Sequence, residues 1–304
     1  MSTLARSGYA KLIWHALALF VVVVWGTTFI STKLLLASLT PIEILLYRSV
    51  IAYGILFVLS PRISRPQGLR TELTYLLAAI SGLTLYFVCE NNALRWTYTS
   101  NVSLIVSTAP LISALVAPVF VRTEQWTRNT ILGGVVSFVG VGFIVTNSSL
   151  VLALNPLGNL LAFLSAVAWA AFPIALSRIN DSLDKITRMR KIFFYGIATT
   201  LVYMFAFDEE LMNANVFRVP VAENLAFLGV VASALCYVVW SQAVIRLGVG
   251  NTIMYMYFVP IVTMFVGSIV LREQITTLMV IGAVLILGGV AIKNMGRQEP
   301  FITS

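Results

Sequence analysis

The sequence predicts an all-α protein that crosses a membrane ten times and is built from two inverted five-helix repeats. Three observations lead to this fold class. Of the 304 residues, 59% are hydrophobic and only 11% are charged, whereas a soluble globular domain has roughly 25% charged residues, so lipid must cover the surface. Apolar stretches of about 20 residues, the length of a transmembrane helix, follow one another along the chain. The second half repeats motifs of the first half at a nearly constant offset.

Each predicted helix is an apolar stretch that ends at a short polar connection. Because these connections are short, successive helices are expected to be antiparallel neighbours. The ten stretches are 12–37, 41–60, 72–94, 99–121, 129–148, 156–178, 187–206, 222–246, 250–271 and 276–295.

The internal repeat indicates how the ten helices are grouped. A unit of five crossings is odd, so a second copy that follows it takes the opposite orientation in the membrane. We expect residues 1–150 to form the first repeat and residues 151–304 to form the second. The matched positions are Asn101 with Asn251, Pro110 with Pro260, Arg48 with Arg190, Glu124 with Glu273, and Gly133 and Gly140 with Gly282 and Gly289.

The distribution of Lys and Arg predicts the orientation of the chain, because cytoplasmic segments carry the excess of positive charge. With the N-terminus inside, the inside segments hold fifteen of the twenty basic residues and the outside segments hold four, while Arg48 lies within a span. We therefore expect a multi-pass protein of the inner (plasma) membrane with both termini in the cytoplasm. The net charge of +8 then reflects topology, with a further attraction to anionic lipid, and a nucleic-acid partner is not expected.

Several motifs resemble those of one transporter superfamily. The segment Trp25-Gly26-Thr27-Thr28-Phe29 resembles the W-G-x-x-F signature of the drug/metabolite transporter superfamily. Glu124 and Glu273 resemble the glutamates of the E-x-(hydrophobic)-T element of its EamA-type members, and the resemblance covers nearly the whole chain. It implies an inner-membrane carrier that works by alternating access, often an exporter of amino acids, other metabolites or toxic compounds. The second half has Ala170-Ala171 where the first has Gly26-Thr27, so strict functional symmetry is not expected.

Two matched prolines indicate where a substrate would bind. At a rise of about 1.5 Å per residue, Pro110 lies roughly 16 Å into its span and Pro260 roughly 15 Å into its own, near the middle of a core about 30 Å thick. Proline removes a backbone hydrogen bond and interrupts the helix, and matched interruptions in the two repeats are typical of a transporter's binding site. The alternative is that both are packing kinks that neighbouring helices accommodate.

Aromatic and ionisable residues within the spans are further candidates for the substrate site. Trp25 and Trp169 lie slightly past the centre of their spans rather than at an interface, and aromatic faces attract cationic groups. Arg48 lies roughly 10 Å deep from the outer side, and Glu90 is expected only a few ångströms from the outer surface. Charged groups in spans are usually functional, so Arg48 is expected to attract a substrate carboxylate or to form a gate with Glu90. The alternatives are packing for the aromatic residues and a structural pair for the charged ones.

Uncharged polar residues complete the candidate site, although each could equally join two helices by a hydrogen bond. The glycines of the fifth and tenth spans are expected to allow close helix packing. The predicted substrate-binding residues are Trp25, Thr28, Arg48, Glu90, Asn91, Asn101, Pro110, Trp169, Tyr237, Tyr257 and Pro260.

The residue types available exclude several chemistries. The chain has no G-x-x-x-x-G-K-[ST] motif, so ATP is not expected to drive it directly. His15 is the only histidine and no Asp lies within a predicted span, so no catalytic residue, metal site or cofactor is expected. Cys89 and Cys236 are read as small buried apolar side chains.

These observations predict a secondary transporter of small metabolites that exports amino acids or related zwitterions. The alternatives are a multidrug efflux carrier or, in other classes, a channel-like pore or an intramembrane enzyme. The expected partners are a small-molecule substrate and the lipid bilayer, with the oligomeric state left open between a monomer and a homodimer.

Overall fold

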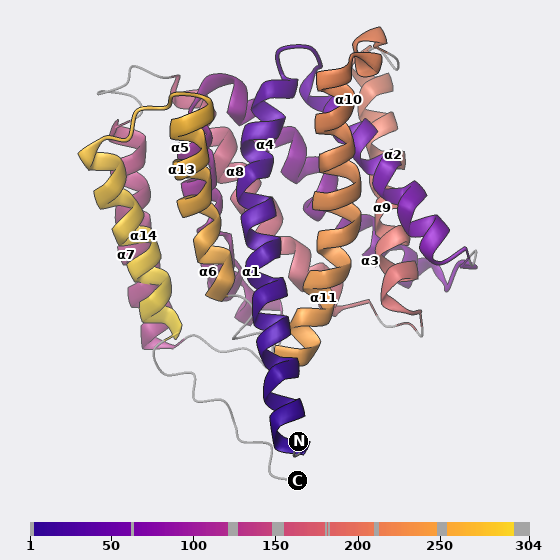
Figure 1. Ribbon diagram of the computed structural model, residues 1–304, viewed down its shortest axis with the longest axis horizontal. Helices are drawn as coiled ribbons and strands as arrows, with labels where there is room; N and C mark the ends of the chain where they lie inside the picture. The colour runs from indigo at the N-terminus through magenta and orange to yellow at the C-terminus, as the bar shows by residue number, and fades with distance from the viewer. Residues whose placement is uncertain are drawn as a thin grey trace.

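A computed structural model describes residues 3–61, 64–120, 127–147, 155–179, 181, 183–209, 213–247 and 254–294. These residues form a bundle of helices that run up and down and contain no strand (Figure 1). The helices are α1 (Thr3–Leu35), α2 (Pro41–Leu59), α3 (Leu69–Ala79), the π-helix η1 (Ile80–Thr84), α4 (Leu85–Trp96), α5 (Thr99–Val106), α6 (Ala109–Phe120), α7 (Arg128–Thr146), α8 (Pro156–Ser177), α9 (Lys185–Ala206), the 3₁₀-helix η3 (Ala214–Phe217), α10 (Val219–Ala226), the π-helix η4 (Phe227–Leu235), α11 (Cys236–Leu247), the 3₁₀-helix η5 (Met254–Tyr257), α13 (Phe258–Val270) and α14 (Thr277–Asn294).

Each predicted apolar stretch coincides with one helix or with a continuous run of helices. Six helical segments among the described residues are long and apolar enough to cross a membrane, and two shorter apolar helices follow near the end of the chain. Helix α9 is not among these six segments, because four basic residues in its first two turns lower its mean hydropathy. The predicted class, an all-α polytopic membrane protein, is confirmed. The predicted repeat boundary at residue 150, like Glu124 and Asn251 of the repeated motifs, lies outside the described residues.

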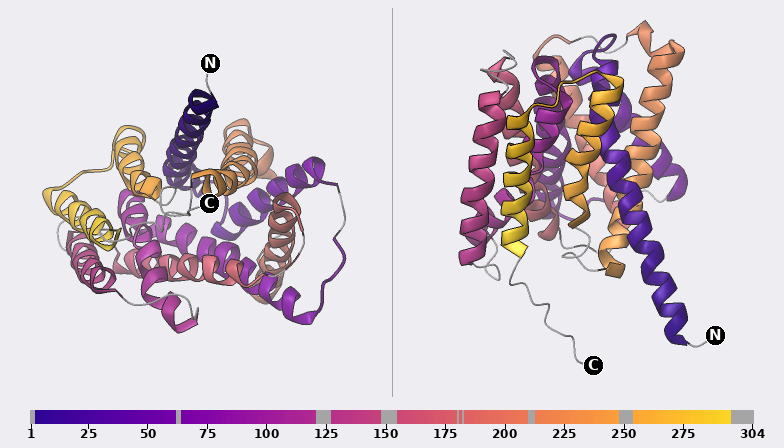
Figure 2. Two further views of the ribbon diagram at one scale, coloured as in Figure 1. Left: turned by 90° about the horizontal axis from the view of Figure 1, so that it is seen from below. Right: turned by 60° about the vertical axis from the view of Figure 1, so that its left-hand side comes forward.

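Equivalent helices of the two predicted repeats pair with each other at opposite edges of the bundle. Helix α2 packs against α9, and α7 packs against α14; the views in Figures 1 and 2 place these two pairs at opposite edges. Between them, α8 contacts α4, α5 and α6, while α1 contacts α11 and α13. The two halves of the chain are therefore interlocked, and residues from both halves meet in the middle of the bundle.

Glycines bring the backbones of α7 and α14 into direct contact, as the sequence predicted, except that an added Cβ at Gly142 or Gly288 would have no neighbour within 4 Å. A Cβ atom added at Gly140 would lie 2.8 Å from the carbonyl oxygen of Gly282, and one added at Gly289 would lie 2.4 Å from the carbonyl oxygen of Gly133. The Ser137 hydroxyl donates a hydrogen bond of 3.0 Å to the Ile286 carbonyl. Small residues allow this close approach of helices in a membrane.

The long helices are capped where they begin, and their outer faces are apolar. At α2, Thr40 and Glu43 form a reciprocal capping box, which satisfies two backbone donors. At α9, the Asp184 carboxylate accepts from the amides of Ile186 and Thr187. Large apolar side chains are exposed around the bundle, with Val58 and Phe205 each about three-quarters exposed, as expected for a surface that faces lipid.

The bundle has two distinct ends. We call the end at which α1 begins and α14 finishes the termini end, and the opposite end the far end (Figure 1). The connections between α2 and α3 and between α8 and α9 lie at the termini end, whereas the connection between α4 and α5 lies at the far end.

Candidate substrate cavity

A cavity of about 70 Å³ lies between the two halves of the chain in the middle of the bundle. Its walls come from α1, α2, α4, α5, α6 and α8, together with α11, η5 and α13. Both predicted repeats therefore contribute. The lining residues are Trp25, Thr28, Phe29, Arg48, Tyr86, Phe87, Glu90, Ser103, Val106, Ser107, Pro110, Trp169, Tyr237, Met256 and Val259.

Aromatic rings form much of the cavity wall and contact one another across the halves. The rings of Trp25 and Tyr237 are 5.6 Å apart and meet edge to face, and those of Tyr86 and Trp169 are 4.8 Å apart. The indole nitrogen of Trp25 donates a 3.0 Å hydrogen bond to the carbonyl of Ala232 in η4. Such aromatic contacts add stability beyond apolar burial, so they hold the wall in a defined shape.

Arg48 lies in this wall, and two of its three guanidinium nitrogens make hydrogen bonds to other described residues. Its side chain is buried, and the guanidinium carbon lies 4.0 Å from the centre of the Phe87 ring. Its Nε and Nη2 atoms donate to the Ser233 hydroxyl at 3.3 and 3.1 Å. Among the described residues, Nη1 has no hydrogen-bond partner. A buried donor of this kind normally finds a partner, so Nη1 is available to a ligand.

Glu90 supplies the opposite charge to the same cavity. It lies one helical turn after Tyr86, which also lines the cavity, and its Oε2 atom has no hydrogen-bond partner among the described residues. Only 2% of the residue is exposed, so Glu90 is buried within the bundle, while its expected depth of a few ångströms below the outer membrane surface stays a prediction. Helix α4 continues for six residues to Trp96, which adds about 9 Å of helix beyond Glu90.

The gate that the sequence suggested between Arg48 and Glu90 is not closed here. No oxygen of Glu90 lies within 4.0 Å of an Arg48 nitrogen, because the ion pairs among the described residues are Arg188–Asp181 and Lys191–Glu72. The two charged groups therefore line one cavity without neutralising each other directly.

Both predicted prolines lie where a helix begins again after an interruption. Pro110 is the second residue of α6, after a turn at Ser107–Thr108 that separates α6 from α5. Pro260 is the third residue of α13, which follows the 3₁₀-helix η5. Proline is tolerated in a first helical turn because its missing amide would have no partner there. The predicted interruption of both spans is thus confirmed, and Pro110 lines the cavity while Pro260 is buried next to the lining residue Val259.

The other predicted site residues fall into two groups. The first group lines the cavity and consists of Trp25, Thr28, Arg48, Glu90, Pro110, Trp169 and Tyr237. The second group does not line it and consists of Asn91, Asn101, Tyr257 and Pro260. The Asn91 amide donates 2.9 Å to the carbonyl of Pro41, and that of Asn101 donates 3.0 Å to the Thr97 hydroxyl. These two asparagines make contacts of the kind that join structural elements, which was the alternative. Whether any of the eleven residues contacts substrate stays a prediction.

The sequence interpretation missed several residues of this cavity. Tyr86 lies four positions before Glu90, a spacing that places both on one helix face, so this residue could have been found. Ser233, which accepts from Arg48 but is not itself a lining residue, could not have been found. It lies within the π-helix η4, where hydrogen bonds span five residues and change which side chains face inward. Ser103 and Ser107 lie on α5 and at its end, and their direction depends on the break before Pro110.

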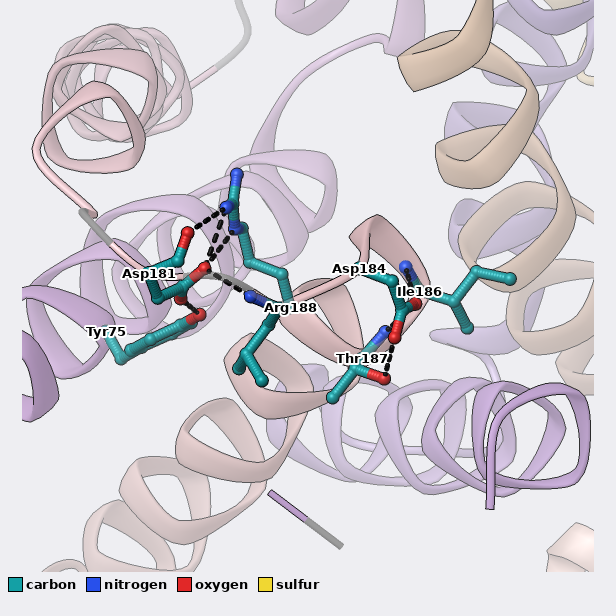
Figure 3. Close-up of polar contacts among 7 residues, drawn as sticks. Tyr75, Asp181, Asp184, Ile186, Thr187 and Arg188 are labelled. Atoms are coloured by element: carbon teal, nitrogen blue, oxygen red, sulfur yellow. Dashed lines mark hydrogen bonds and ion pairs between the residues drawn. The ribbon is translucent and has the colours of Figure 1, made fainter. Parts of the chain in front are cut away.

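A second polar group joins the two halves at the termini end. Figure 3 shows Tyr75 of α3 donating to Asp181, which also accepts from Arg188 at 2.7 Å. Next to it, Lys191 pairs with Glu72 at 2.6 Å. Burial raises the pKa of the Asp181 carboxyl, but hydrogen bonds from Tyr75 and Arg188 outweigh burial and hold this pKa below its usual value. Two ion pairs and the Tyr75–Asp181 hydrogen bond join these five residues, which are named here the termini-end cluster.

No group of three or more His, Cys, Asp or Glu side chains that could hold a metal ion occurs in the part of the chain that the structure describes. The groups that line the cavity and could contact a ligand are therefore one guanidinium group, one carboxyl group, several hydroxyl groups and a set of aromatic rings.

Comparison with known proteins gives the family. The family model described as "EamA-like transporter family" matches residues 12–146 and again residues 156–295. An "Uncharacterized transporter" of Archaeoglobus fulgidus is 27% identical, over 94% of this chain and 98% of that protein. A "Probable amino-acid metabolite efflux pump" of Salmonella typhimurium is 24% identical, over 92% and 94%. A "Probable terminal-alkyne amino-acid exporter" of Streptantibioticus cattleyicolor is 26% identical, over 95% and 96%.

The two successive matches together cover nearly the whole chain. They agree with the resemblance seen in the sequence, and they identify a membrane transporter rather than an enzyme, with a small-molecule substrate and a surface in contact with lipid. The chain belongs to the EamA-like transporter family of the drug/metabolite transporter superfamily.

Proposed function

We propose that this transporter is a secondary carrier that exports amino acids or related small zwitterions, and that the central cavity is its substrate site. One observation carries the proposal. Arg48 and Glu90 both line the cavity, and neither Nη1 of Arg48 nor Oε2 of Glu90 has a hydrogen-bond partner among the described residues.

A zwitterion would satisfy both charged groups at once. A buried charge without a partner is unfavourable, and charged side chains within a membrane are usually functional. The carboxylate of an amino acid would accept from Arg48, and its ammonium group would donate to Glu90 and face the rings of Trp25 and Tyr237. A polyanionic substrate would need more than one cation, and among the described residues Arg48 is the only Lys or Arg that lines the cavity.

The size of the cavity favours a small substrate. A volume of about 70 Å³ is well below the roughly 300 to 1,000 Å³ of pockets that bind drug-sized ligands. In this conformation a compact amino acid would nearly fill the space, whereas a large amphipathic drug would need the wall aromatics to separate. The cavity therefore supports the amino-acid carrier over the multidrug carrier.

The proposed direction of transport and the proposed orientation of the chain in the membrane are supported by different observations. The names of two relatives, from Salmonella typhimurium and Streptantibioticus cattleyicolor, refer to efflux or export of amino-acid compounds. The excess of fifteen basic residues to four supports an inner-membrane protein with the termini end in the cytoplasm. The family match in two successive segments supports repeats of residues 1–150 and 151–304 in inverted orientation. The termini-end cluster would then close the cytoplasmic side, and alternating access would require it to open.

Counterflow into vesicles tests the proposal. Purified protein is reconstituted into liposomes loaded with one unlabelled amino acid, and uptake of labelled amino acids is followed against a panel of large amphipathic cations. We expect saturable uptake that is stimulated by internal amino acid. Flux that does not saturate would indicate a pore, and stimulation by amphipathic cations alone would indicate a multidrug carrier; either result would contradict the proposal.

A further inference from the structure

Glu273 lies outside the cavity, yet it binds the start of a helix that forms part of the cavity wall. Its carboxylate is buried and accepts four hydrogen bonds from two consecutive residues of the other half of the chain. Oε1 accepts from the amide of Thr99 at 2.6 Å and from its hydroxyl at 2.9 Å. Oε2 accepts from the amide of Ser100 at 3.1 Å and from its hydroxyl. Both oxygens are therefore fully engaged with the first residues of α5.

Helix α5 has no cap of its own at this end. Its N-cap residue is Tyr98, whose side chain makes no capping hydrogen bond. The first amides of a helix have no partner within the helix, and they carry partial positive charge that favours an anion. Glu273 supplies that anion from 174 residues further along the chain.

The end of α13 is shaped to deliver this carboxylate. Arg272 has a φ of 55°, a left-handed conformation that is unfavourable for a residue other than glycine, and the amide of Glu273 then donates 3.3 Å back to the Gly267 carbonyl. A Cβ atom at Gly267 would lie 2.9 Å from the Thr99 hydroxyl oxygen and 3.1 Å from Oε2 of Glu273. Only a glycine leaves the capped helix start in its observed position.

A cation holds the other side of the same corner. Lys33, in the last turn of α1, donates to the carbonyls of Leu94 and Thr97, where α4 ends and a positive charge is favoured. The α4–α5 corner at the far end is thus fixed by an anion on the start of α5 and a cation on the end of α4.

Both helices at this corner carry cavity-lining residues. Helix α4 bears Glu90, and α5 bears Ser103 and Val106. Because α5 has only two turns before the break at Ser107, its position depends strongly on how its first turn is held. We infer that Glu273 is a positioning residue, which sets the α5 wall of the cavity by capping that helix from the opposite half of the chain.

The inference rests on the proposed substrate site, and its test separates the two. Glu273→Gln keeps the shape of the side chain but replaces one acceptor oxygen by a donor, which would face the donors of Thr99 or Ser100. We expect KM in counterflow to rise about tenfold, as loss of hydrogen bonds to a charged group allows, with Vmax per folded molecule little changed. Glu223→Gln, at an exposed glutamate of α10, is the matched control and should change neither quantity.

A second readout follows the wall directly. A cysteine introduced by Val106→Cys is labelled with a small thiol reagent, and the parent protein gives the background from Cys89 and Cys236. Its labelling rate should change when Glu273→Gln is added and stay the same with Glu223→Gln. If the rate changes while KM does not, Glu273 positions α5 but the cavity is not the substrate site, so the proposed function fails and the positioning role stands.

Two milder variants guard against misfolding. Ser100→Ala removes one hydroxyl donor to Glu273, and Glu273→Asp keeps the charge on a shorter side chain. Both variants should raise KM, but by less than Glu273→Gln does. The inference is overturned if folded Glu273→Gln, or these milder variants where it does not fold, shows unchanged KM and unchanged labelling. A loss of thermal stability alone, with both readouts unchanged in the folded fraction, would make Glu273 merely structural.

Discussion

Arg48 and Arg190 occupy matched positions in the second and seventh spans, yet they have different surroundings. Each is buried, each lies over a phenylalanine ring, at 4.0 Å for Phe87 and 5.4 Å for Phe57, and each donates to a serine of the other half of the chain. The acceptor for Arg190 is the backbone carbonyl of Ser60, which caps the end of α2. Among the described residues, the acceptor for Arg48 is the Ser233 hydroxyl alone, and its Nη1 atom has no hydrogen-bond partner.

The comparison shows what the predicted repeat does and does not preserve. Position in the span, stacking on an aromatic ring and a contact with the other half are kept. The group that accepts the hydrogen bond differs between the two arginines, and this group determines what each arginine does. A helix end favours a positive charge, so Arg190 is stabilised where it lies. A single hydroxyl cannot satisfy a guanidinium group with five donors, so Nη1 of Arg48 has no hydrogen-bond partner among the described residues, which supports the proposed binding role.

Replacing Arg48 should have the largest effect. Removing one partner of a buried charged interaction costs about 2 to 5 kcal/mol, so Arg48→Ala should lower Vmax/KM in counterflow by about a hundredfold or more. Arg48→Lys should also be strongly impaired, since an ammonium group cannot bind Ser233 and a carboxylate in the same planar arrangement. Arg218→Lys, at an exposed arginine, serves as the control. Near-normal transport by folded Arg48→Ala would remove the distinction between the two arginines.

Neutralising Glu90 should have the next largest effect and should depend on the substrate. Glu90→Gln removes the negative charge opposite Arg48, so the apparent affinity for amino acids should fall about thirtyfold, as loss of one charged hydrogen bond of roughly 2 kcal/mol implies. The deaminated analogue of the same amino acid should be affected much less. Competition in counterflow measures both. An equal loss for the two compounds would mean that Glu90 does not face the ammonium group.

Arg190→Ala should reduce stability rather than affinity. The loss of a charged hydrogen bond at the end of α2 is expected to cost about 1.5 to 3 kcal/mol, which would appear as a lower midpoint of thermal unfolding in detergent. The molecules that remain folded should keep their KM. A large rise in KM with unchanged stability would show that the matched arginines share one role, contrary to the comparison.

Ser233→Ala should have the smallest effect. Arg48 would keep its charge and its stacking on Phe87 but lose its hydroxyl partner, at a cost of about 1 kcal/mol, so KM should rise by a few fold. Ser268→Ala, whose hydroxyl donates to the Phe265 carbonyl of its own helix and does not line the cavity, is a matched control. An effect as large as that of Arg48→Ala would indicate that Ser233 itself contacts the substrate.

Most of the fold could be predicted from the sequence because length and apolarity determine membrane crossings. The breaks at Pro110 and Pro260 were also predictable, since proline removes a specific backbone hydrogen bond. The direction of side chains in the third and eighth spans was not, because the π-helices η1 and η4 change the helical register there without a sequence signal as clear as proline. For that reason Ser233 was missed.

Partners that depend on long-range contacts were equally hard to foresee. The sequence identified Glu273 as part of a repeated motif, but nothing local indicates that its carboxylate caps α5. Asn91 and Asn101 are of the right type for a substrate site, and only the structure shows that their amides bind Pro41 and Thr97 instead of lining the cavity.

Direct binding to the purified carrier tests the central claim, that Arg48 and Glu90 together bind a zwitterion. The amino acid that gives the strongest counterflow is titrated calorimetrically beside its methyl ester and its deaminated analogue, with wild type and with Arg48→Lys. The account predicts that the zwitterion binds wild type at least about tenfold more tightly than either analogue, a difference of about 1.4 kcal/mol. In Arg48→Lys, the difference in affinity between the amino acid and its methyl ester should be smaller. Binding of the cationic ester as tight as that of the amino acid in wild type would contradict it.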